Sequence, residues 1–333
     1  MKVLFLIQGF DVPSSRYRVL QYLPFLKEAG IESEVRPFPE TIRESLRVYG
    51  AAGAYDAVFL HRKRPGAFLL RRLRRSARAI IYDVDDAVMY RDTRSGGRSR
   101  SRTRQRRFAA VCRAADEVIV GNDYLRRHAE PHARRVTVIP TSLDAARYAP
   151  RGWGETNGTV TLGWIGDTGS VGYLERMREI FDDLSDRDAH LRLKVVSNRF
   201  PPAGRMPLLR KEWRAEEELS DLQSFDIGIM PLSDDPWSQG KCGLKLLQYM
   251  AAGVPAVASP VGVNRDILRD GVEGFHAATS AEWVDRILRL ASDAPLRERM
   301  GRAGAERVAQ GYTLAQSAPR IVEVLQRAAK AGV

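Results

Sequence analysis

The chain has 333 residues, of which 44% are hydrophobic and 28% charged, a composition typical of a soluble globular protein. Its length exceeds the size at which one hydrophobic core usually keeps growing, so we expect two domains of about 150 residues each. No apolar run reaches the roughly 18 residues that span a bilayer. The two cysteines, Cys112 and Cys242, indicate neither a disulfide framework nor a zinc site, which favours a reducing cytoplasm.

The first half of the chain alternates strand and helix signals. Its short N-terminal apolar run has no small-residue cleavage site, so it is interpreted as a strand rather than a signal peptide. Strands separated by helices at this spacing predict parallel βαβ units. The predicted strands are Val3–Ile7, Glu32–Phe38, Ala57–Leu60, Ala79–Tyr82, Glu117–Val120 and Val136–Ile139, and the predicted helices are Arg16–Ala29, Pro65–Arg75, Phe108–Ala115 and Asp123–His128.

The same alternation restarts after residues 151–158, whose composition is that of a linker. Two such halves predict an α/β protein of two Rossmann-like, doubly wound parallel-sheet domains facing a cleft, with ligands outside the carboxyl ends of the strands. The predicted strands are Val160–Ile165, Leu191–Val196, Asp226–Met230 and Ala256–Ala258, and the predicted helices are Val171–Leu184, Glu216–Gln223, one from about Leu244 and a last one from about Pro319.

The segment from residue 236 to residue 275 predicts an anion site. Gly240 and Gly243 allow the backbone to turn closely before a helix that begins near Leu244. A helix N-terminus offers unpaired N–H groups and partial positive charge, which suit a phosphate. Lys241 and Lys245 would add full charge, either from one helix face or from the helix and the loop before it. The spacing is not that of a Walker A loop.

Motifs along nearly the whole chain together resemble the GT-B glycosyltransferases, and more narrowly the bacterial members of glycosyltransferase family 4. Each motif is weak alone, but their order along the chain is specific. They are Ser14–Arg18, Tyr82–Asp86, Gly121–Leu125, Val138–Thr141, Leu162–Gly166, Phe225–Leu232 and the segment 236–275.

The resemblance implies GT-B architecture, with residues 1–150 as the acceptor domain and residues 159–312 as the nucleotide-sugar donor domain. A C-terminal helix within residues 313–333 would cross back to the first domain. The implied activity is transfer of a sugar from a nucleoside-diphosphate sugar to an acceptor, with retention of anomeric configuration. It requires no metal, and the nucleotide sugar is a substrate, so no cofactor is expected.

The resemblance also carries over residue roles. The donor would contact the residues that follow the first strand of each domain and those of the glycine–lysine loop, where Lys241 and Lys245 would stabilise charge on the leaving diphosphate. Family members commonly carry two glutamates in this loop, but here those positions hold Gly240 and Gln248. The donor-binding candidates are Gly9, Arg16, Gly166, Asp167, Gly240, Gly243, Leu244 and Gln248.

Two further groups in the first half are candidates for the chemistry. His61 follows a predicted strand and would contact the donor sugar; the competing interpretation is a surface histidine beside Arg62. Arg16 would contact phosphate, whereas Arg18 is interpreted as a surface charge on its helix.

Three aspartates after the fourth predicted strand leave alternatives open. Asp86, or Asp85, would bind the acceptor or accept a proton from its hydroxyl. Alternatively, Asp83 and Asp85 form the D-x-D metal motif of a metal-dependent GT-A transferase. A third interpretation is a cap for the following turn. The repeated domain pattern favours the first, so no metal is assigned.

The arginine-rich stretch Arg91–Arg107 accounts for much of the charge asymmetry, because residues 1–150 carry a net charge of +13 and the remainder −1. Its partner would be an anionic membrane surface, a negatively charged acceptor or, less favoured, nucleic acid. A solvated, mobile loop is the preferred alternative. We therefore expect a cytoplasmic protein with optional contact to the inner membrane face. A non-catalytic, glycosyltransferase-like binding protein is a third functional hypothesis.

Overall fold

The computed structural model describes residues 1–92, 99–153 and 158–331, and these fall into two compact units. Unit 1 comprises Met1–Ser142, Asp235–Cys242 and Leu314–Val333, and unit 2 comprises Leu143–Asp234 and Gly243–Thr313. Residues 154–157 of the expected linker lie outside the described residues, as do residues 93–98 of the arginine-rich stretch. Within the described part of the chain, no helix is both long and apolar enough to cross a membrane.

Unit 1 is built on a six-stranded parallel sheet in the order β2-β1-β3-β4-β5-β6. Unit 2 repeats the plan with a parallel sheet in the order β12-β11-β10-β7-β8-β9. The prediction of two doubly wound α/β domains is confirmed. The strands of unit 1 are β1 (Lys2–Ile7), β2 (Glu32–Pro37), β3 (Ala57–His61), β4 (Ile80–Val84), β5 (Glu117–Val120) and β6 (Val136–Val138).

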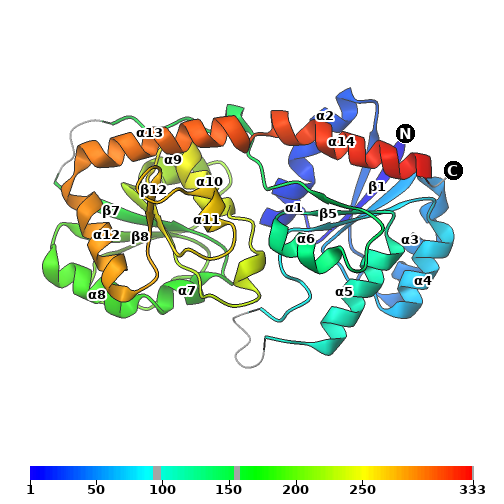
Figure 1. Cartoon of the computed structure of the whole chain (residues 1–333), viewed down its shortest axis with the longest axis horizontal. Coiled ribbons are helices and arrows are strands. Elements are labelled where there is room, and N and C mark those ends of the chain that lie inside the picture. The colour runs from blue at the N-terminus through cyan, green and yellow to red at the C-terminus, as the bar shows by residue number, and fades with distance from the viewer. Residues whose placement is uncertain (93–98, 154–157, 332–333) are drawn as a thin grey trace. The chain divides into compact units, whose positions relative to one another are not determined.

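Side chains that alternate along β1 separate the two cores of unit 1. Leu4 and Leu6 pack under α3 (Ile42–Gly50), α4 (Ala67–Ser76), α5 (Arg102–Ala114) and α6 (Asp123–Ala129). Val3 and Phe5 point to the opposite face, which α2 (Leu23–Glu28) and α14 (Leu314–Ala331) cover (Figure 1). Both faces of the sheet are therefore buried, as a parallel sheet requires.

The first predicted helix is broken into three pieces: α1 (Pro13–Arg18), a 3₁₀ turn (Leu20–Tyr22) and α2. The chain leaves the helical region at Val19, with φ −131° and ψ −61°, and Pro24 lies in the first turn of α2. Proline is compatible with a first turn but not with a continuous helix, because it lacks an N–H. The helical periodicity was correct, but the break was not predicted.

The interpretation of Arg91–Arg107 as a loop is wrong for its last third. Helix α5 begins at Arg102, six residues before the predicted start, and the side chain of Ser101 accepts a hydrogen bond from the backbone N–H of Arg104. Ser101 is thus an N-cap. The buried Phe108 and Val111 hold the helix on the sheet, so tertiary packing compensates for its charge.

The strands of unit 2 are β7 (Val160–Ile165), β8 (Leu191–Val196), β9 (Leu208–Lys211), β10 (Ile227–Met230), β11 (Ala256–Ala258) and β12 (Gly274–His276). Helices α8 (Arg178–Arg187) and α12 (Ser280–Ser292) cover one face, where Leu162 and Trp164 of β7 are buried. Helices α10 (Leu244–Ala251) and α13 (Ala294–Gly311) pack together on the other side (Figure 1). The predicted helix Val171–Leu184 is divided into α7 (Val171–Glu175) and α8, and a short α9 (Glu218–Gln223) precedes β10.

Helix α14 returns to unit 1 and packs against α2, β3 and β4. Ile321, Val324 and Leu325 are buried there, and Arg327 pairs with the buried Glu117 at 2.7 Å. The helix starts at Leu314 rather than near Pro319, which lies in its second turn.

Residues Asp235–Cys242 also belong to unit 1, although they follow β10 of unit 2. The side-chain amide of Asn122 donates hydrogen bonds to the carbonyl oxygens of Gly240 and Lys241, each at 3.1 Å. Trp237 completes the core of unit 1. Asn122 thus fixes this segment as well as capping α6 through Leu125.

Candidate functional site

The strand orders show where the connections between strands reverse direction in each sheet. In unit 2 the chain leaves β7 toward the face covered by α8, and it reaches α10 on the other face after β10. In unit 1 the same reversal separates β1 from β3. Ligands bind doubly wound sheets at such reversal points. Gly166 and Asp167 follow β7, whereas Gly9 follows β1 and His61 ends β3, so these candidates lie where a ligand is expected.

Lys245, Trp164 and Gly166 form a compact group in unit 2. The Nζ atom of Lys245 lies over the ring of Trp164, 5.3 Å from its centroid, and Trp164 is 1% exposed. A Cβ atom on Gly166 would lie 2.5 Å from Cη2 of Trp164 and 2.6 Å from Cε of Lys245. The cation–π contact holds the ammonium beside the glycine loop. A glycine is therefore required at residue 166 because any larger residue would displace the lysine.

Replacing Gly166 by alanine is expected to destabilise unit 2 by about 1–3 kcal/mol, because the buried Trp164 leaves no room for the added methyl group. Urea unfolding of the two proteins measures this change. Gly172→Ala is the matched control, because no atom lies closer than 4.0 Å to a Cβ atom built there. Equal stability of Gly166→Ala and wild type would contradict the packing argument.

Helix α10 begins where the sequence predicts. Gly243 is its N-cap, with φ +69°, and no side chain caps the helix. A Cβ atom at Gly243 would also clash with Ile267, so both its conformation and its surroundings require glycine. The first backbone N–H groups, starting with that of Leu244, have no partner within the helix. The loop before this helix is thus suited to an anion.

The two lysines do not share a helix. Lys245 lies in the first turn of α10, whereas Lys241 precedes the Gly243 turn and belongs to unit 1. The Nζ atom of Lys241 lies 5.7 Å from the ring centroid of Trp237. The sequence allowed both lysines on one helix face or one on the helix and one in the loop before it. The structure has the second arrangement, with Lys245 on the helix and Lys241 in the loop.

Gly240 has no space for a side chain. A Cβ atom there would lie 2.5 Å from Cβ and 2.7 Å from the backbone N of Ala87. The glutamate that family members carry at this position therefore cannot be restored without moving the segment.

Gln248 is 4% exposed and belongs to a hydrogen-bonded chain that the sequence did not reveal. Its amide donates to the hydroxyl of Tyr148 at 3.3 Å, and Tyr148 donates to Glu218 at 3.2 Å. Trp213 donates to the second oxygen of Glu218 at 3.1 Å. Tyr148 and Glu218 are far from Gln248 in sequence, so no local signal indicates this grouping.

The centre of unit 1 is a buried ion pair between Arg18 and Asp83. Arg18 is 2% exposed, so its interpretation as a surface charge is wrong. Its Nε donates to Asp83 at 3.2 Å, its Nη2 donates to the other Asp83 oxygen, and its Nη1 donates to the carbonyl of Ile139 at 2.7 Å. Arg18 is the last residue of the short helix α1, and its side chain is buried where the chain leaves the helix at Val19.

His61 is fully buried, which contradicts the alternative of a surface histidine. Its Nδ1 lies 2.9 Å from Oδ2 of Asp83. Burial alone would raise the pKa of Asp83, but Arg18 and the hydrogen bond from His61 outweigh it and lower that pKa. An ionised carboxylate only accepts hydrogen bonds, so Nδ1 of His61 carries the proton. The Nε2 atom is then directed away from Asp83.

In the D-x-D alternative, the metal would have to bind a carboxylate that is already paired. Both oxygens of Asp83 accept hydrogen bonds from Arg18, and one also accepts from His61. A metal ion would have to displace the guanidinium from a buried ion pair. Asp83 is therefore a structural anchor for Arg18 and His61.

Asp85 and Asp86 share the guanidinium of Arg62. The Nε of Arg62 lies 3.1 Å from Oδ1 of Asp85, and its Nη2 pairs with Asp86. Arg62 is the one non-glycine residue with positive φ, at +62°, within residues 1–92, 99–153 and 158–331. Such conformations cost free energy and concentrate at functional sites. Arg62 holds the half-buried carboxylates of Asp85 and Asp86 at the carboxyl edge of the sheet.

A small gap separates His61 from Asp85. The Nε2 atom of His61 and Oδ1 of Asp85 are 4.0 Å apart; Nε2 is buried without a hydrogen-bond partner among the described residues, whereas Oδ1 has only its ion pair with Arg62. Buried polar atoms are rarely left unpaired. One hydroxyl oxygen placed between them would be within hydrogen-bonding distance of both.

The remaining candidates have structural contacts of their own. The side chain of Asp167 accepts hydrogen bonds from the backbone N and the hydroxyl of Ser170, at 2.8 and 2.7 Å, so it caps the turn before α7. The guanidinium of Arg16 lies 5.5 Å from the ring centroid of Tyr17. A Cβ atom on Gly9 would lie 3.3 Å from Val12, so this position tolerates little more than glycine.

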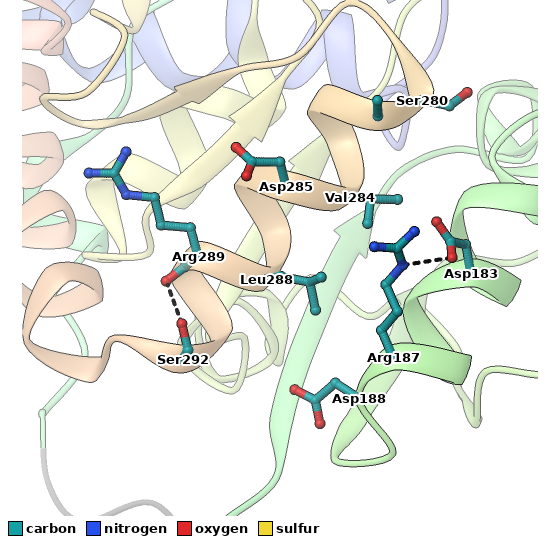
Figure 2. Close-up of a pocket in the computed structure, with 10 residues that line it drawn as sticks. Asp183, Arg187, Asp188, Ser280, Val284, Asp285, Leu288, Arg289 and Ser292 are labelled. Carbon is teal, nitrogen blue, oxygen red and sulfur yellow. Dashed lines mark hydrogen bonds and ion pairs between the residues drawn. The ribbon is translucent and has the colours of Figure 1, made fainter.

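A pocket of about 750 Å³ lies elsewhere in unit 2, between α8 and α12, and contains none of these candidates (Figure 2). Its charges are mixed in sign, and Arg187 pairs with Asp183 at 2.8 Å. Its lining is Asp183, Arg187, Asp188, Ser280, Ala281, Val284, Asp285, Leu288, Arg289 and Ser292. Nothing in this lining indicates a class of ligand.

Comparison with known proteins finds a sequence match that lies mostly within unit 2. Residues 218–307 match the family described as glycosyl transferases group 1. A phosphatidyl-myo-inositol mannosyltransferase of Mycobacterium leprae (strain TN) is 39% identical over 92 residues, which are 27% of this chain and 24% of that protein. The match thus spans about a quarter of the length of this relative.

Solved structures resemble the whole chain. A sucrose-phosphate synthase from Thermosynechococcus elongatus has a TM-score of 0.75 at 15% identity, covering 98% of both chains. HepE of Anabaena, in complex with UDP and glucose, has a TM-score of 0.71 at 16% identity, covering 98% of this chain and 99% of HepE. Likeness at this identity shows the fold. The chain therefore has the GT-B fold of the glycosyltransferases, and its residues 218–307 match glycosyl transferases group 1.

Proposed function

We propose that this protein is a glycosyltransferase that transfers a sugar from a nucleoside-diphosphate sugar to an acceptor hydroxyl. The observation that carries the proposal is the arrangement of Lys245, Gly166 and the uncapped N-terminus of α10 at the carboxyl edge of unit 2. Lys245 and α10 lie within residues 218–307, which match glycosyl transferases group 1. Gly166 precedes that segment in sequence and lies beside Lys245. The complex of HepE with UDP and glucose supports the same class of donor.

The leaving group determines what this site has to do. When the bond between the anomeric carbon and the diphosphate breaks, negative charge develops on the leaving oxygen. The ammonium of Lys245 and the N–H groups of the first turn of α10 stabilise that charge more in the transition state than in the ground state. Lys241 and Arg16 are further candidate cations. The reaction then needs no metal, and we propose retention of configuration.

In unit 1, we propose that the gap between His61 and Asp85 receives a hydroxyl group. The Nε2 atom of His61 accepts the hydroxyl proton in a hydrogen bond, or Asp85 accepts it instead. Asp86, held by Arg62, is the candidate that takes the acceptor proton as the new glycosidic bond forms.

Release of nucleoside diphosphate from a panel of UDP-, GDP- and dTDP-sugars, with and without EDTA, tests the proposal. We expect one donor to be hydrolysed slowly without an acceptor, at a rate that EDTA does not change. Loss of turnover in EDTA would favour the metal-dependent alternative. If no nucleotide is turned over and none raises the melting temperature, the donor site is refuted and a non-catalytic protein is favoured.

A further inference from the structure

An arginine in unit 1 has a buried nitrogen atom without a hydrogen-bond partner. Arg64 follows β3 by three residues, and its Nη1 atom is buried without a partner among the described residues. A buried guanidinium is normally paired, because removing its charge from water costs free energy. The unpaired nitrogen of Arg64 therefore indicates a position where a ligand could bind.

The neighbours of Arg64 are cations rather than carboxylates. Burial lowers the pKa of Arg64, and the nearby Arg104, Arg62 and Arg107 lower it further. The one hydroxyl that acts on it is that of Tyr82, whose pKa burial raises well above its usual value, so this group is neutral. Only Arg62 has its charge balanced there, by Asp85 and Asp86.

The two helices that contribute to this surface contain no acidic residue. Helices α4 and α5 pack together, and neither carries an Asp or a Glu. Arg104 donates a hydrogen bond to the carbonyl of Tyr90 at 2.8 Å, which fixes its guanidinium without neutralising it. Arg107 is exposed and has no ion pair among the described residues. Two guanidinium groups without a counter-charge, those of Arg104 and Arg107, thus act on Arg64.

The cluster lies at the functional edge of unit 1. Arg64 is three residues from His61 along the segment that leaves β3, and Arg104 lies in the first turn of α5. Helix N-termini favour negative charge, so the N-terminus of α5 also favours an anion beside Arg104. Arg64 is thus three residues along the chain from the edge of the His61–Asp85 gap, where the proposed hydroxyl group binds.

We propose that Arg64, Arg104 and Arg107 form a binding site for a phosphate group carried by the acceptor. The proposal rests on the proposed function, because it names the class of acceptor for the same edge of unit 1. Guanidinium groups bind phosphate oxygens in pairs of charge-assisted hydrogen bonds, and a bound phosphate would offset the mutual repulsion of the arginines. The phosphate belongs either to a soluble ester or to a lipid headgroup.

Binding of inorganic phosphate and of glycerol 3-phosphate, measured by calorimetry at constant ionic strength, tests this site. Vesicles of phosphatidylcholine with and without phosphatidic acid test the lipid source. The variant is Arg64→Gln, and Arg113→Gln is the matched control, because Arg113 is exposed on α5, which also carries Arg104 and Arg107, and its replacement removes the same charge. We expect Arg64→Gln to weaken phosphate binding at least tenfold and Arg113→Gln to change it less than twofold.

Stability separates binding from a structural role. Without phosphate, Arg64→Gln should unfold at the temperature of the wild type or above it, because it removes an uncompensated charge. Loss of binding to the soluble esters supports a soluble acceptor, and loss of binding to phosphatidic acid vesicles alone supports a lipid acceptor. No phosphate binding by wild type, equal losses in both variants, or destabilisation by Arg64→Gln would overturn the proposal.

The outcome is independent of donor turnover. If the wild type binds phosphate through Arg64 but hydrolyses no donor, the anion site stands and the transferase proposal fails. If a donor is hydrolysed but phosphate does not bind, the transferase proposal stands and the anion site fails.

Discussion

Replacing Asp83 by asparagine is expected to destabilise the protein by about 3–5 kcal/mol, because it leaves the buried guanidinium of Arg18 without its counter-charge. Arg18 and Asp83 have side chains that are 1% and 0% exposed, so water cannot replace the lost interaction. Asparagine keeps only one acceptor oxygen, so Nε and Nη2 of Arg18, which donate to different oxygens of Asp83, can no longer both donate. Urea unfolding monitored by tryptophan fluorescence measures the change.

A surface ion pair provides the control. Arg126 pairs with Asp123 at 2.7 Å, but these side chains are 36% and 66% exposed. Exposed pairs contribute little, so Arg126→Ala should change the free energy of unfolding by about 0.5 kcal/mol or less. If Asp83→Asn and Arg126→Ala had similar effects, the Arg18–Asp83 pair would not be the anchor of unit 1.

The Arg18–Asp83 pair also makes the stability of the protein depend on pH. The pKa of Asp83 is lowered in the folded protein, so its contribution to stability is complete above the unfolded value of about 4 and is lost as pH falls through the folded value. The stability difference between wild type and Asp83→Asn should therefore be constant near neutral pH and shrink below pH of about 4. A stability difference that stays unchanged as the pH falls well below about 4 would contradict this assignment.

Replacing Lys245 by alanine is expected to lower the rate of donor hydrolysis by about 10²–10³-fold, because one fixed charge at the leaving diphosphate is lost. Lys245→Arg keeps the charge but changes its position beside Trp164, so an intermediate rate is expected. Release of nucleoside diphosphate from the best donor of the panel measures all three proteins.

Lys27→Ala is the control for this loss of charge, since Lys27 is exposed in the last turn of α2. Its turnover should equal that of the wild type. A Lys245→Ala enzyme as active as Lys27→Ala would remove Lys245 from the proposed mechanism. A Lys245→Ala enzyme with unchanged turnover but lower donor affinity would assign the lysine to ground-state binding.

Strands were the elements that the sequence predicted best. Glu117–Val120, Val160–Ile165, Leu191–Val196 and Ala256–Ala258 have the predicted bounds. Fully buried strands read as short apolar runs, so their limits are visible locally. The position of Gly243 before α10 was also visible, because a left-handed N-cap needs glycine.

Helix limits were predicted less well. The breaks at Val19 and between α7 and α8 leave the 3.6-residue periodicity almost unchanged, so the pattern does not show them. The arginine-rich sequence at the start of α5 does not resemble that of a helix, yet the buried Phe108 and Val111 anchor α5 to the sheet. In these cases tertiary contacts outweigh local preference.

The sequence by itself determined the two parallel sheets, the glycine turn before α10 and the net positive charge of the first half. These depend on periodicity, glycine positions and composition, all of which are local or additive. Only the tertiary structure decided that Arg18 and His61 meet at Asp83, that Glu218 reaches Gln248 through Tyr148, and that a nitrogen of Arg64 is buried without a partner among the described residues. The free energy of each charge depends on its burial and on partners distant in sequence, and folding alone brings those together.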